Sequence, residues 1–452
     1  MTTKMIDGLR LGRIMSVPVL AAALLFAGCD TEKLLEVKDT ETVSPTTLEN
    51  KDLMDIVYTG ALGEFTNAWD NATDALVSVT AVFSDEMFSS GTFPTRTATD
   101  RRAQYTPADG NTSDGAYVNL HQARYALNDA AKRIEGWEST SHPYYQEMRA
   151  LQGYVYLGLG ENFCAPIPFA ELKDGAFTYS APLSLAEVFT AAGALFDQAG
   201  GTNLAKVGKA RALLGAGQYA QAAAAVSGVP TNYVYWVRHS DNGVRNGLYS
   251  LQGNGRYSVS DKEGSVGLPF RSANDPRVPW YRDAAQPNGF DAAYALYKSK
   301  RHYSFGAPVP LATGVEARLI EAEAKLAAGD GAGMITILNA LRADVGNLMK
   351  AMYPGYAEAN PTLAPLTDPG TAAARRDLLF RERAFWLYGT ASRMGDQRRM
   401  VRQYGVGQAT VFPTGDYHKG GVHGTDVAFP LDFDEINNTE YDPATCDVSK
   451  AG

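Results

Sequence analysis

Cysteine and histidine are scarce in this sequence, with 3 and 6 copies among 452 residues. The histidines include no helical pair of metal ligands such as H-E-x-x-H. The chain also lacks a P-loop, a G-x-G-x-x-G turn and a G-x-S-x-G nucleophile elbow. We therefore expect no metal and no cofactor, and no motif points to a nucleotide-binding site or a nucleophilic serine.

Positive charge is in deficit as well, since 41 basic residues face 50 acidic ones and the formal net charge is −9. Such a chain is a poor candidate for binding nucleic acid or an anionic lipid surface through its charge. No stretch after Phe26 is long and apolar enough to span a bilayer. The 45% of hydrophobic residues nevertheless suffices for a packed core.

The sequence begins with a secretory leader at residues 1–28. Basic residues precede an apolar stretch at 17–26, and the small residues Ala27 and Gly28 stand directly before Cys29. Bacterial lipoproteins have this layout, in which the cysteine thiol receives a diacylglycerol and becomes the new N-terminus. We predict lipidation at Cys29, which would hold the protein on a membrane by its acyl chains. The alternative is an ordinary signal peptide followed by a chance cysteine.

Residues 29–46 are polar and rich in threonine, and we predict that they form a tether in front of a body at 47–452. Cys164 and Cys446 are the cysteines that remain. In an oxidising compartment they can form a disulfide that ties the C-terminal tail to the middle of the chain. Two free thiols are the alternative.

Helical periodicity dominates the body. Apolar residues recur at three- and four-residue steps in the segments 117–135, 145–163, 185–198 and 375–388. Ser184 and Glu187 have the spacing of a capping box at the start of the third segment. We therefore predict a mainly α fold.

Two longer segments, 205–226 and 315–345, each consist of a helical pattern, a Gly-containing break and a second helical pattern. This is typical of a tetratricopeptide helix hairpin. Between them, residues 231–310 are rich in Gly, Asn, Pro, Arg and aromatics without a sustained helical period. Segments 83–106 and 405–452 have the same texture, and loops of this length are often functional.

Seven pieces of the chain together resemble the SusD/RagB family of bacterial outer-membrane nutrient-binding lipoproteins. In chain order they are Cys29, residues 58–65 (YTGALGEF), 149–163 (RALQGYVYLGLGENF), 267–277 (GLPFRSANDPR), 317–323 (ARLIEAE), 381–399 (RERAFWLYGTASRMGDQRR) and 429–438 (FPLDFDEINN). The resemblance covers nearly the whole chain after the leader.

The resemblance implies a single SusD-like domain at 47–452, in which tetratricopeptide-like pairs form a superhelical body with long irregular loops. It further implies a cell-surface protein, lipid-anchored in the outer membrane. Such a protein binds a nutrient, most often a glycan, and delivers it to a SusC-like TonB-dependent transporter without catalysis.

Glycan capture needs flat aromatic faces for sugar C–H groups, with charged or amide partners for the hydroxyls. Two loop regions contain that mixture of residues, and we take six of them as candidate ligand-binding residues: Asp85, Phe93, Arg96, Trp236, Trp280 and Arg282. Phe93 and Trp280 are the preferred platforms. The alternative is that these aromatics pin their loops to the body.

Other clusters favour structural roles. Asp275-Pro276-Arg277 is interpreted as a structural turn with an ion pair, and Arg393, Arg398, Arg399 and Arg402 as a solvated or salt-bridged helix face. A metal site at His418 and His423, with Asp416 and Asp426, is not favoured, because the segment is loop-like and rich in glycine. A surface glycoside hydrolase and a protein-binding scaffold stay open as alternative functions.

Overall fold

The computed structural model of the chain describes residues 49–71, 74–173 and 176–452, and residues 51–452 form one unit. The predicted leader, Cys29 and the tether lie outside the described residues. The α-helices of the described residues are α2 (Met54–Trp69), α3 (Leu76–Phe83), α4 (Pro94–Asp100), α5 (Thr112–Trp137), α6 (Pro143–Asn162), α7 (Leu185–Asp197), α8 (Asn203–Gly215), α9 (Tyr219–Val226), α10 (Gly247–Gly253), α11 (Gly314–Ala327), α12 (Gly331–Ala343), α13 (Val345–Met352), α14 (Ala372–Trp386) and α15 (Arg393–Tyr404).

The strands are short and form two-stranded antiparallel sheets, each of which closes or connects loops. They are β1 (Met87–Ser89), β2 (Glu171–Lys173), β3 (Ala176–Thr178), β4 (Val234–Val237), β5 (Tyr257–Val259), β6 (Trp280–Tyr281), β7 (Lys298–Ser299) and β8 (Val309–Thr313). β1 pairs with β5, β2 with β3, β4 with β8 and β6 with β7.

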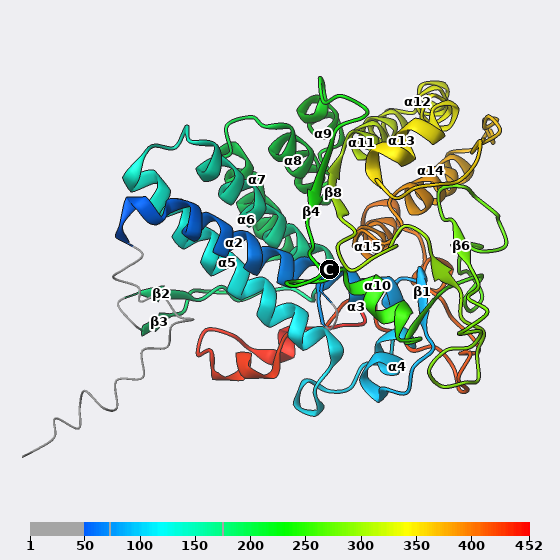
Figure 1. Cartoon of the computed structure of the whole chain (residues 1–452), viewed down its shortest axis with the longest axis horizontal. Coiled ribbons are helices and arrows are strands. Elements are labelled where there is room, and N and C mark those ends of the chain that lie inside the picture. Colours follow the sequence, from blue (N-terminus) through cyan, green and yellow to red (C-terminus); the bar gives the residue numbers. More distant parts are fainter. Residues whose placement is uncertain (1–48, 72–73, 174–175) are drawn as a thin grey trace, which may run out of the picture. The chain divides into compact units, whose positions relative to one another are not determined.

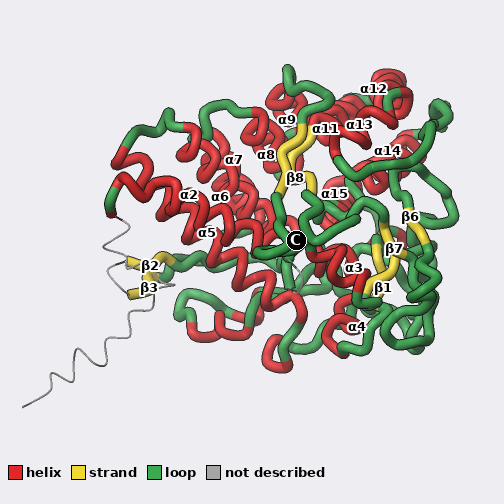
Figure 2. Tube along the Cα trace, in the orientation of Figure 1, coloured by secondary structure: helices red, strands yellow, loops and turns green. Residues whose placement is uncertain are grey.

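The helical body consists of helices that pack mainly on their neighbours along the chain. α2, α5, α6, α7, α8 and α9 follow one another, and α11 packs on α9 before it meets α12 and α14 (Figure 1). The predicted mainly α fold is confirmed. Long loops gather around β1, β6 and β7 at the other end of the unit (Figure 2).

Both predicted helix hairpins are present, as α8–α9 and α11–α12. Gly217 and Gly329 stand in their turns with φ of 74° and 76°, a conformation that favours glycine. The predicted capping box also forms, since Ser184 accepts a hydrogen bond from the Glu187 amide and the Glu187 side chain accepts one from the Ser184 amide. These local signals specify helix ends because they satisfy backbone groups within one turn.

The region 231–310 contains little regular structure, as its composition predicts. It holds the seven-residue α10, four strands of two to four residues and the beginning of β8. The strands β4 and β8 connect this region to the helical body, whereas β5, β6 and β7 stay within the loop-rich end.

Buried ion pairs join the helices to the loops. Arg277 is fully buried and pairs with Asp275 (2.7 Å) and with Glu382 of α14 (2.6 Å). Arg399 of α15 pairs with Glu323 and Asp396, and all three side chains are buried. The structural interpretation of Asp275-Pro276-Arg277 is therefore confirmed. Of the α15 arginines, Arg393 and Arg399 form ion pairs, whereas Arg398 and Arg402 donate to backbone carbonyls. Arg393, Arg398 and Arg399 are buried, so this face of α15 is not solvated as a whole.

Cys164 and Cys446 form a disulfide, with their Cα atoms 5.3 Å apart. It joins the end of α6 to the C-terminal segment, which also lies beside α6 through a hydrogen bond from the Cys164 amide to the Phe429 carbonyl (2.9 Å). Among the described helices, none has both the length and the apolar character needed to cross a membrane.

Candidate functional site

The loop-rich end is organised around strand β1. β1 pairs with β5 in the register Met87–Val259 to Ser89–Tyr257. The strand pairing places Phe93, which follows β1, on the same side as Arg256, which precedes β5.

Ser90 connects these two segments to a third. Its amide donates to the Arg256 carbonyl (2.8 Å), its hydroxyl donates to the Gly255 carbonyl (2.8 Å), and its carbonyl accepts from the Asp291 amide (3.0 Å). A side chain at Gly289 would collide with Ser90, since an added Cβ would lie 2.4 Å from the Ser90 Cβ. The loop that carries Phe290 is therefore held directly against β1.

The result is an exposed surface of two phenylalanine rings and two guanidinium groups, here called the aromatic–arginine surface (Phe93, Arg96, Arg256 and Phe290). The Arg256 guanidinium lies 3.4 Å from the centre of the Phe290 ring and 4.8 Å from that of Phe93. Arg96 lies 4.9 Å from the same Phe93 ring. Phe93 and Phe290 remain 49% and 54% exposed, so both rings are open to a ligand.

Within the described residues, the arginines of this surface, Arg96 and Arg256, have no carboxylate at ion-pair distance. Arg96 nevertheless acts on the nearby Asp74, whose pKa burial raises and Arg96 lowers. Burial and the nearby Arg96 both lower the pKa of Arg256 from its usual value, although the group stays cationic at neutral pH. Guanidinium groups over aromatic faces can bind oxygen atoms of a ligand at their free edges.

The position of Asp85 corrects its prediction as a ligand-binding residue. It is 1% exposed, and its two oxygens accept hydrogen bonds from Arg393 (3.1 Å) and from the Leu268 amide (3.0 Å). A carboxylate with both oxygens occupied in the core is not available to a ligand. Its charge suggested a sugar contact, but the fold uses it to hold α15 against the loops.

Trp280 and Arg282 lie on the loop that carries Phe290 and stabilise it. The Trp280 indole donates to the Arg271 carbonyl (3.2 Å), and its ring packs edge-on against Tyr297 at 5.2 Å. Arg282 donates to the Pro287 carbonyl (2.7 Å), three residues before Phe290. Both residues have local partners, so we regard them as supports of the loop and not as its platform.

Trp236 lies in a different part of the molecule. It is half-buried on β4, and its indole donates to the Met352 carbonyl (2.9 Å). It lines a cavity of about 690 Å³ together with Tyr58 and Glu147. The structure thus brings together only Phe93 and Arg96 of the six candidates in one exposed cluster.

Sequence reasoning missed Arg256 and Phe290. Arg256 directly follows Gly255, and Phe290 directly follows Gly289. Both glycines permit close contact between backbone segments, and a glycine directly before each residue was the signal available in the sequence. Neither could be connected to Phe93 without the β1–β5 pairing, because the three positions are separated by 163 and 34 residues.

A second hollow, of about 790 Å³, lies between α5, the β2–β3 hairpin and the C-terminal segment. Its wall is apolar, with Tyr125 and Phe177 exposed by 47% and 67%. Acidic side chains line one side, among them Asp432 and Glu435. None of the sequence-predicted ligand residues lies there.

These observations define a class: a protein of tetratricopeptide-like helix pairs with long loops that present an exposed aromatic surface. Among solved structures, the chain matches a SusD-like carbohydrate binding protein from Bacteroides vulgatus ATCC 8482, with 17% identity over 76% of this chain and 82% of that one and a TM-score of 0.54. It also matches a SusD/RagB family protein from Bacteroides thetaiotaomicron VPI-5482 (13% identity, 85% and 94% covered, TM-score 0.57) and a SusD-like protein from Bacteroides fragilis NCTC 9343 (13%, 88% and 97%, TM-score 0.58).

The chain therefore has the SusD-like fold, and the resemblance predicted from the sequence is confirmed at this level. No protein-family model and no curated protein matches the sequence. At these identities the comparison establishes the fold, and the ligand has to be argued from the site itself.

Proposed function

We propose that this protein binds a glycan on the aromatic–arginine surface and belongs to the SusD/RagB nutrient-binding proteins. The single observation that carries the proposal is the pair of half-exposed rings, Phe93 and Phe290, that both contact the Arg256 guanidinium. Aromatic faces cover the C–H faces of sugars, and a guanidinium between them can donate hydrogen bonds to hydroxyl or carboxylate oxygens.

Two guanidinium groups that the described residues leave without a carboxylate at ion-pair distance favour an acidic glycan. Arg96 and Arg256 approach the same Phe93 ring, and within the described residues neither has a carboxylate in ion-pair contact. A sugar carboxylate or sulfate would supply a negative charge in direct contact with the guanidinium groups. The surrounding protein is acidic overall, so the attraction would be confined to this surface.

The wider role follows from the fold and the leader. We propose that Cys29 carries a lipid anchor at the outer membrane and that a SusC-like TonB-dependent transporter receives the glycan. Support comes from the lipoprotein-like sequence around Cys29 and from the SusD-like fold. We propose binding without turnover, because the surface offers arginines and aromatics but no paired carboxylates.

Binding should depend on the two exposed rings. We expect Phe290→Ala and Phe93→Ala each to weaken binding of an oligogalacturonide by about tenfold, equivalent to about 1.4 kcal/mol, because each change removes one stacking face. Isothermal titration calorimetry measures the affinity. The thermal midpoint should hardly move, since both rings are about half exposed and Ala leaves no buried cavity.

Phe177→Ala is the matched control, since Phe177 is 67% exposed but lies on β3 beside the other hollow. A neutral gluco-oligosaccharide of the same length should bind more weakly, and its affinity should respond less to added salt. If Phe177→Ala weakened glycan binding as much as Phe93→Ala or Phe290→Ala, the assignment of the binding site to the aromatic–arginine surface would be contradicted. Release of reducing ends from the bound glycan would contradict binding without turnover.

A further inference from the structure

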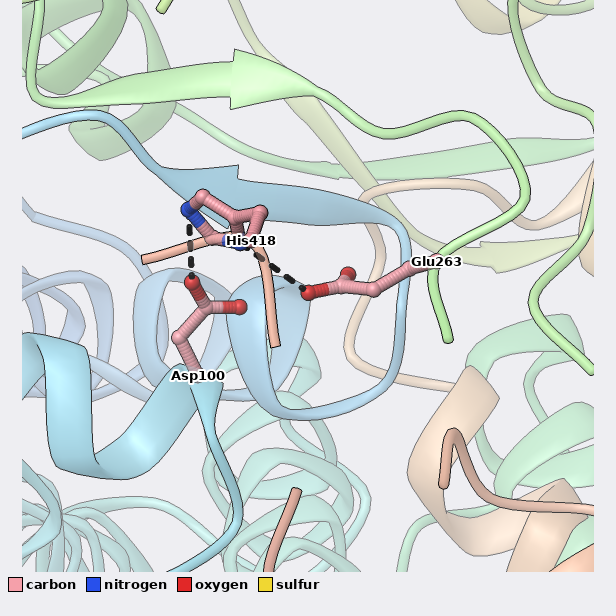
Figure 3. Close-up of side chains that lie close together, drawn as sticks. All are labelled: Asp100, Glu263 and His418. Atoms are coloured by element: carbon pink, nitrogen blue, oxygen red, sulfur yellow. Dashed lines mark ion pairs between the residues drawn. The ribbon is translucent and has the colours of Figure 1, made fainter. Parts of the chain in front are cut away.

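Three side chains with metal-ligand chemistry meet behind β1, outside the aromatic–arginine surface. They are Asp100 at the end of α4, Glu263 in the loop after β5 and His418 in the C-terminal segment (Figure 3). One ligand atom from each lies within 4.8 Å of the other two. The imidazole contacts are 3.9 Å from Nε2 to Asp100 Oδ2 and 3.8 Å from Nδ1 to Glu263 Oε1.

The two carboxylates are buried and incompletely satisfied. The side chain of Asp100 is 0% exposed and that of Glu263 is 7% exposed. Within the described part of the chain, Asp100 Oδ1 and Glu263 Oε1 accept no hydrogen bond from another residue, and the hydrogen bond between the two carboxylates requires a shared proton. Figure 3 shows the carboxylates turned toward the imidazole and toward each other. Two buried carboxylates in contact require a cation or a proton between them.

Protein cations near the cluster are committed elsewhere. Arg102 donates to the backbone carbonyls of Pro413, Gly424 and Asp426, and Lys419 pairs with Asp291 (2.8 Å). Among the described residues, neither forms an ion pair with Asp100 or Glu263. Because Arg102 acts on Glu263 only from beyond ion-pair distance, compensation at close range falls to a proton, on the imidazole or on a carboxylate, or to a cation from outside the chain.

The surrounding hydrogen bonds orient the three groups as ligands. The Ser89 carbonyl accepts from His418 Nε2 (3.1 Å), which leaves the Nδ1 lone pair facing Glu263 Oε1. Asp100 Oδ2 is held by the Ser89 amide (2.8 Å) and the Tyr417 hydroxyl (2.7 Å). Outer partners of this kind fix the tautomer and direction of metal ligands.

We propose that Asp100, Glu263 and His418 bind one divalent transition-metal ion, for which Zn²⁺ has the best-matching ligand chemistry. Imidazole with two carboxylates suits Zn²⁺ and is unsuited to Ca²⁺ or Mg²⁺, which take oxygen ligands. A four-coordinate ion holds its ligand atoms about 2.1 Å away and hence about 3.4 Å from one another, so the side chains, whose ligand atoms lie within 4.8 Å, would close by up to about 1.4 Å. The His418 side chain is 21% exposed and forms the entry side, where water completes the coordination.

The ion would connect three segments that are distant in the sequence. It joins α4, the loop after β5 and the C-terminal segment beside strand β1. Ser90, the residue directly after β1, in turn holds the loop that carries Phe290. Its role is thus structural, as a clamp behind the aromatic–arginine surface. The proposal does not depend on which ligand that surface binds.

The test is Zn²⁺ binding by the purified protein after treatment with EDTA. We expect one Zn²⁺ per chain by calorimetry and a rise of several degrees in the thermal midpoint, with no rise from Ca²⁺ or Mg²⁺. Co²⁺ should give the visible absorption of a four-coordinate site. Glu263→Gln and His418→Ala should each abolish these responses, whereas His423→Asn, in the same segment, should retain them.

The absence of a Co²⁺ band and of Zn²⁺ binding in the unaltered protein would overturn the proposal, whatever the variants do. So would unchanged binding in Glu263→Gln and His418→Ala. If Glu263→Gln stabilises the metal-free protein and the unaltered protein ignores Zn²⁺, the carboxylates share a proton and the site is not a metal site.

Discussion

Replacing Arg277 by Ala should destabilise the protein by about 3–5 kcal/mol, the usual effect of breaking a buried ion pair. The change leaves Asp275 without its nearest cation and takes from Glu382 one of its two arginine partners, the other being Arg342. It also removes a guanidinium that packs over Phe385 and Trp386, at 5.3 and 5.2 Å from their ring centres. Urea unfolding followed by circular dichroism measures the loss.

Arg375→Ala is the matched control for this prediction, because Arg375 lies on the same helix as Glu382. Its ion pair with Asp368 stands at the surface, where the two side chains are 25% and 35% exposed. We expect only a small change there, since solvent screens such pairs. Comparable losses for the two variants would show that burial does not determine the strength of these interactions.

The second large effect concerns acid stability and His302. This residue is 1% exposed, and neither ring nitrogen has a hydrogen-bond partner among the described residues. Burial, assisted by Arg301 and His239, lowers the pKa of His302 to about 3. In the unfolded chain the pKa of a histidine is about 6.5. Below that pH the unfolded state binds a proton that the folded state does not.

The contribution of His302 to the free energy of unfolding therefore falls as the pH drops from about 6.5 toward 3. The slope is about 1.4 kcal/mol per pH unit. His302→Leu has similar volume and cannot be protonated. We expect the stability of the wild type relative to this variant to fall by about 2–3 kcal/mol between pH 6.5 and 4.5. Urea unfolding at several pH values measures it, and the difference at pH 8 gives the packing effect alone. Parallel pH profiles for the two proteins would contradict the prediction.

The sequence identified the helical body well because its signals act over short distances. The capping box of Ser184 and Glu187 and the turn glycines Gly217 and Gly329 each satisfy or permit backbone geometry within a few residues. Helical periodicity predicted the helices correctly because it also depends on residues close in sequence. It indicates which face of a helix is buried and does not specify the partner that covers it.

The candidate site was predicted only in part. Phe93 and Arg96 were found as an aromatic and a charge in one loop, but Asp85 was assigned to the ligand and lies in the core against Arg393. Charge and loop position do not reveal burial, because the partner that buries Asp85 is 308 residues away. The sequence analysis also considered His418 only with its neighbours in the sequence, His423, Asp416 and Asp426. In the structure its carboxylate neighbours are Asp100 and Glu263.

The sequence alone determined that the chain forms mainly helical pairs and separates them with long aromatic loops, and it predicts a lipoprotein leader before Cys29. These properties follow from composition, periodicity and local motifs. Only the tertiary structure decided which loop residues stand together. The β1–β5 pairing and Ser90 bring Phe93, Arg256 and Phe290 into one surface, and the same strand brings Asp100 and Glu263 to His418. The physical reason is that both sites depend on long-range backbone hydrogen bonds, whose partners local sequence does not specify.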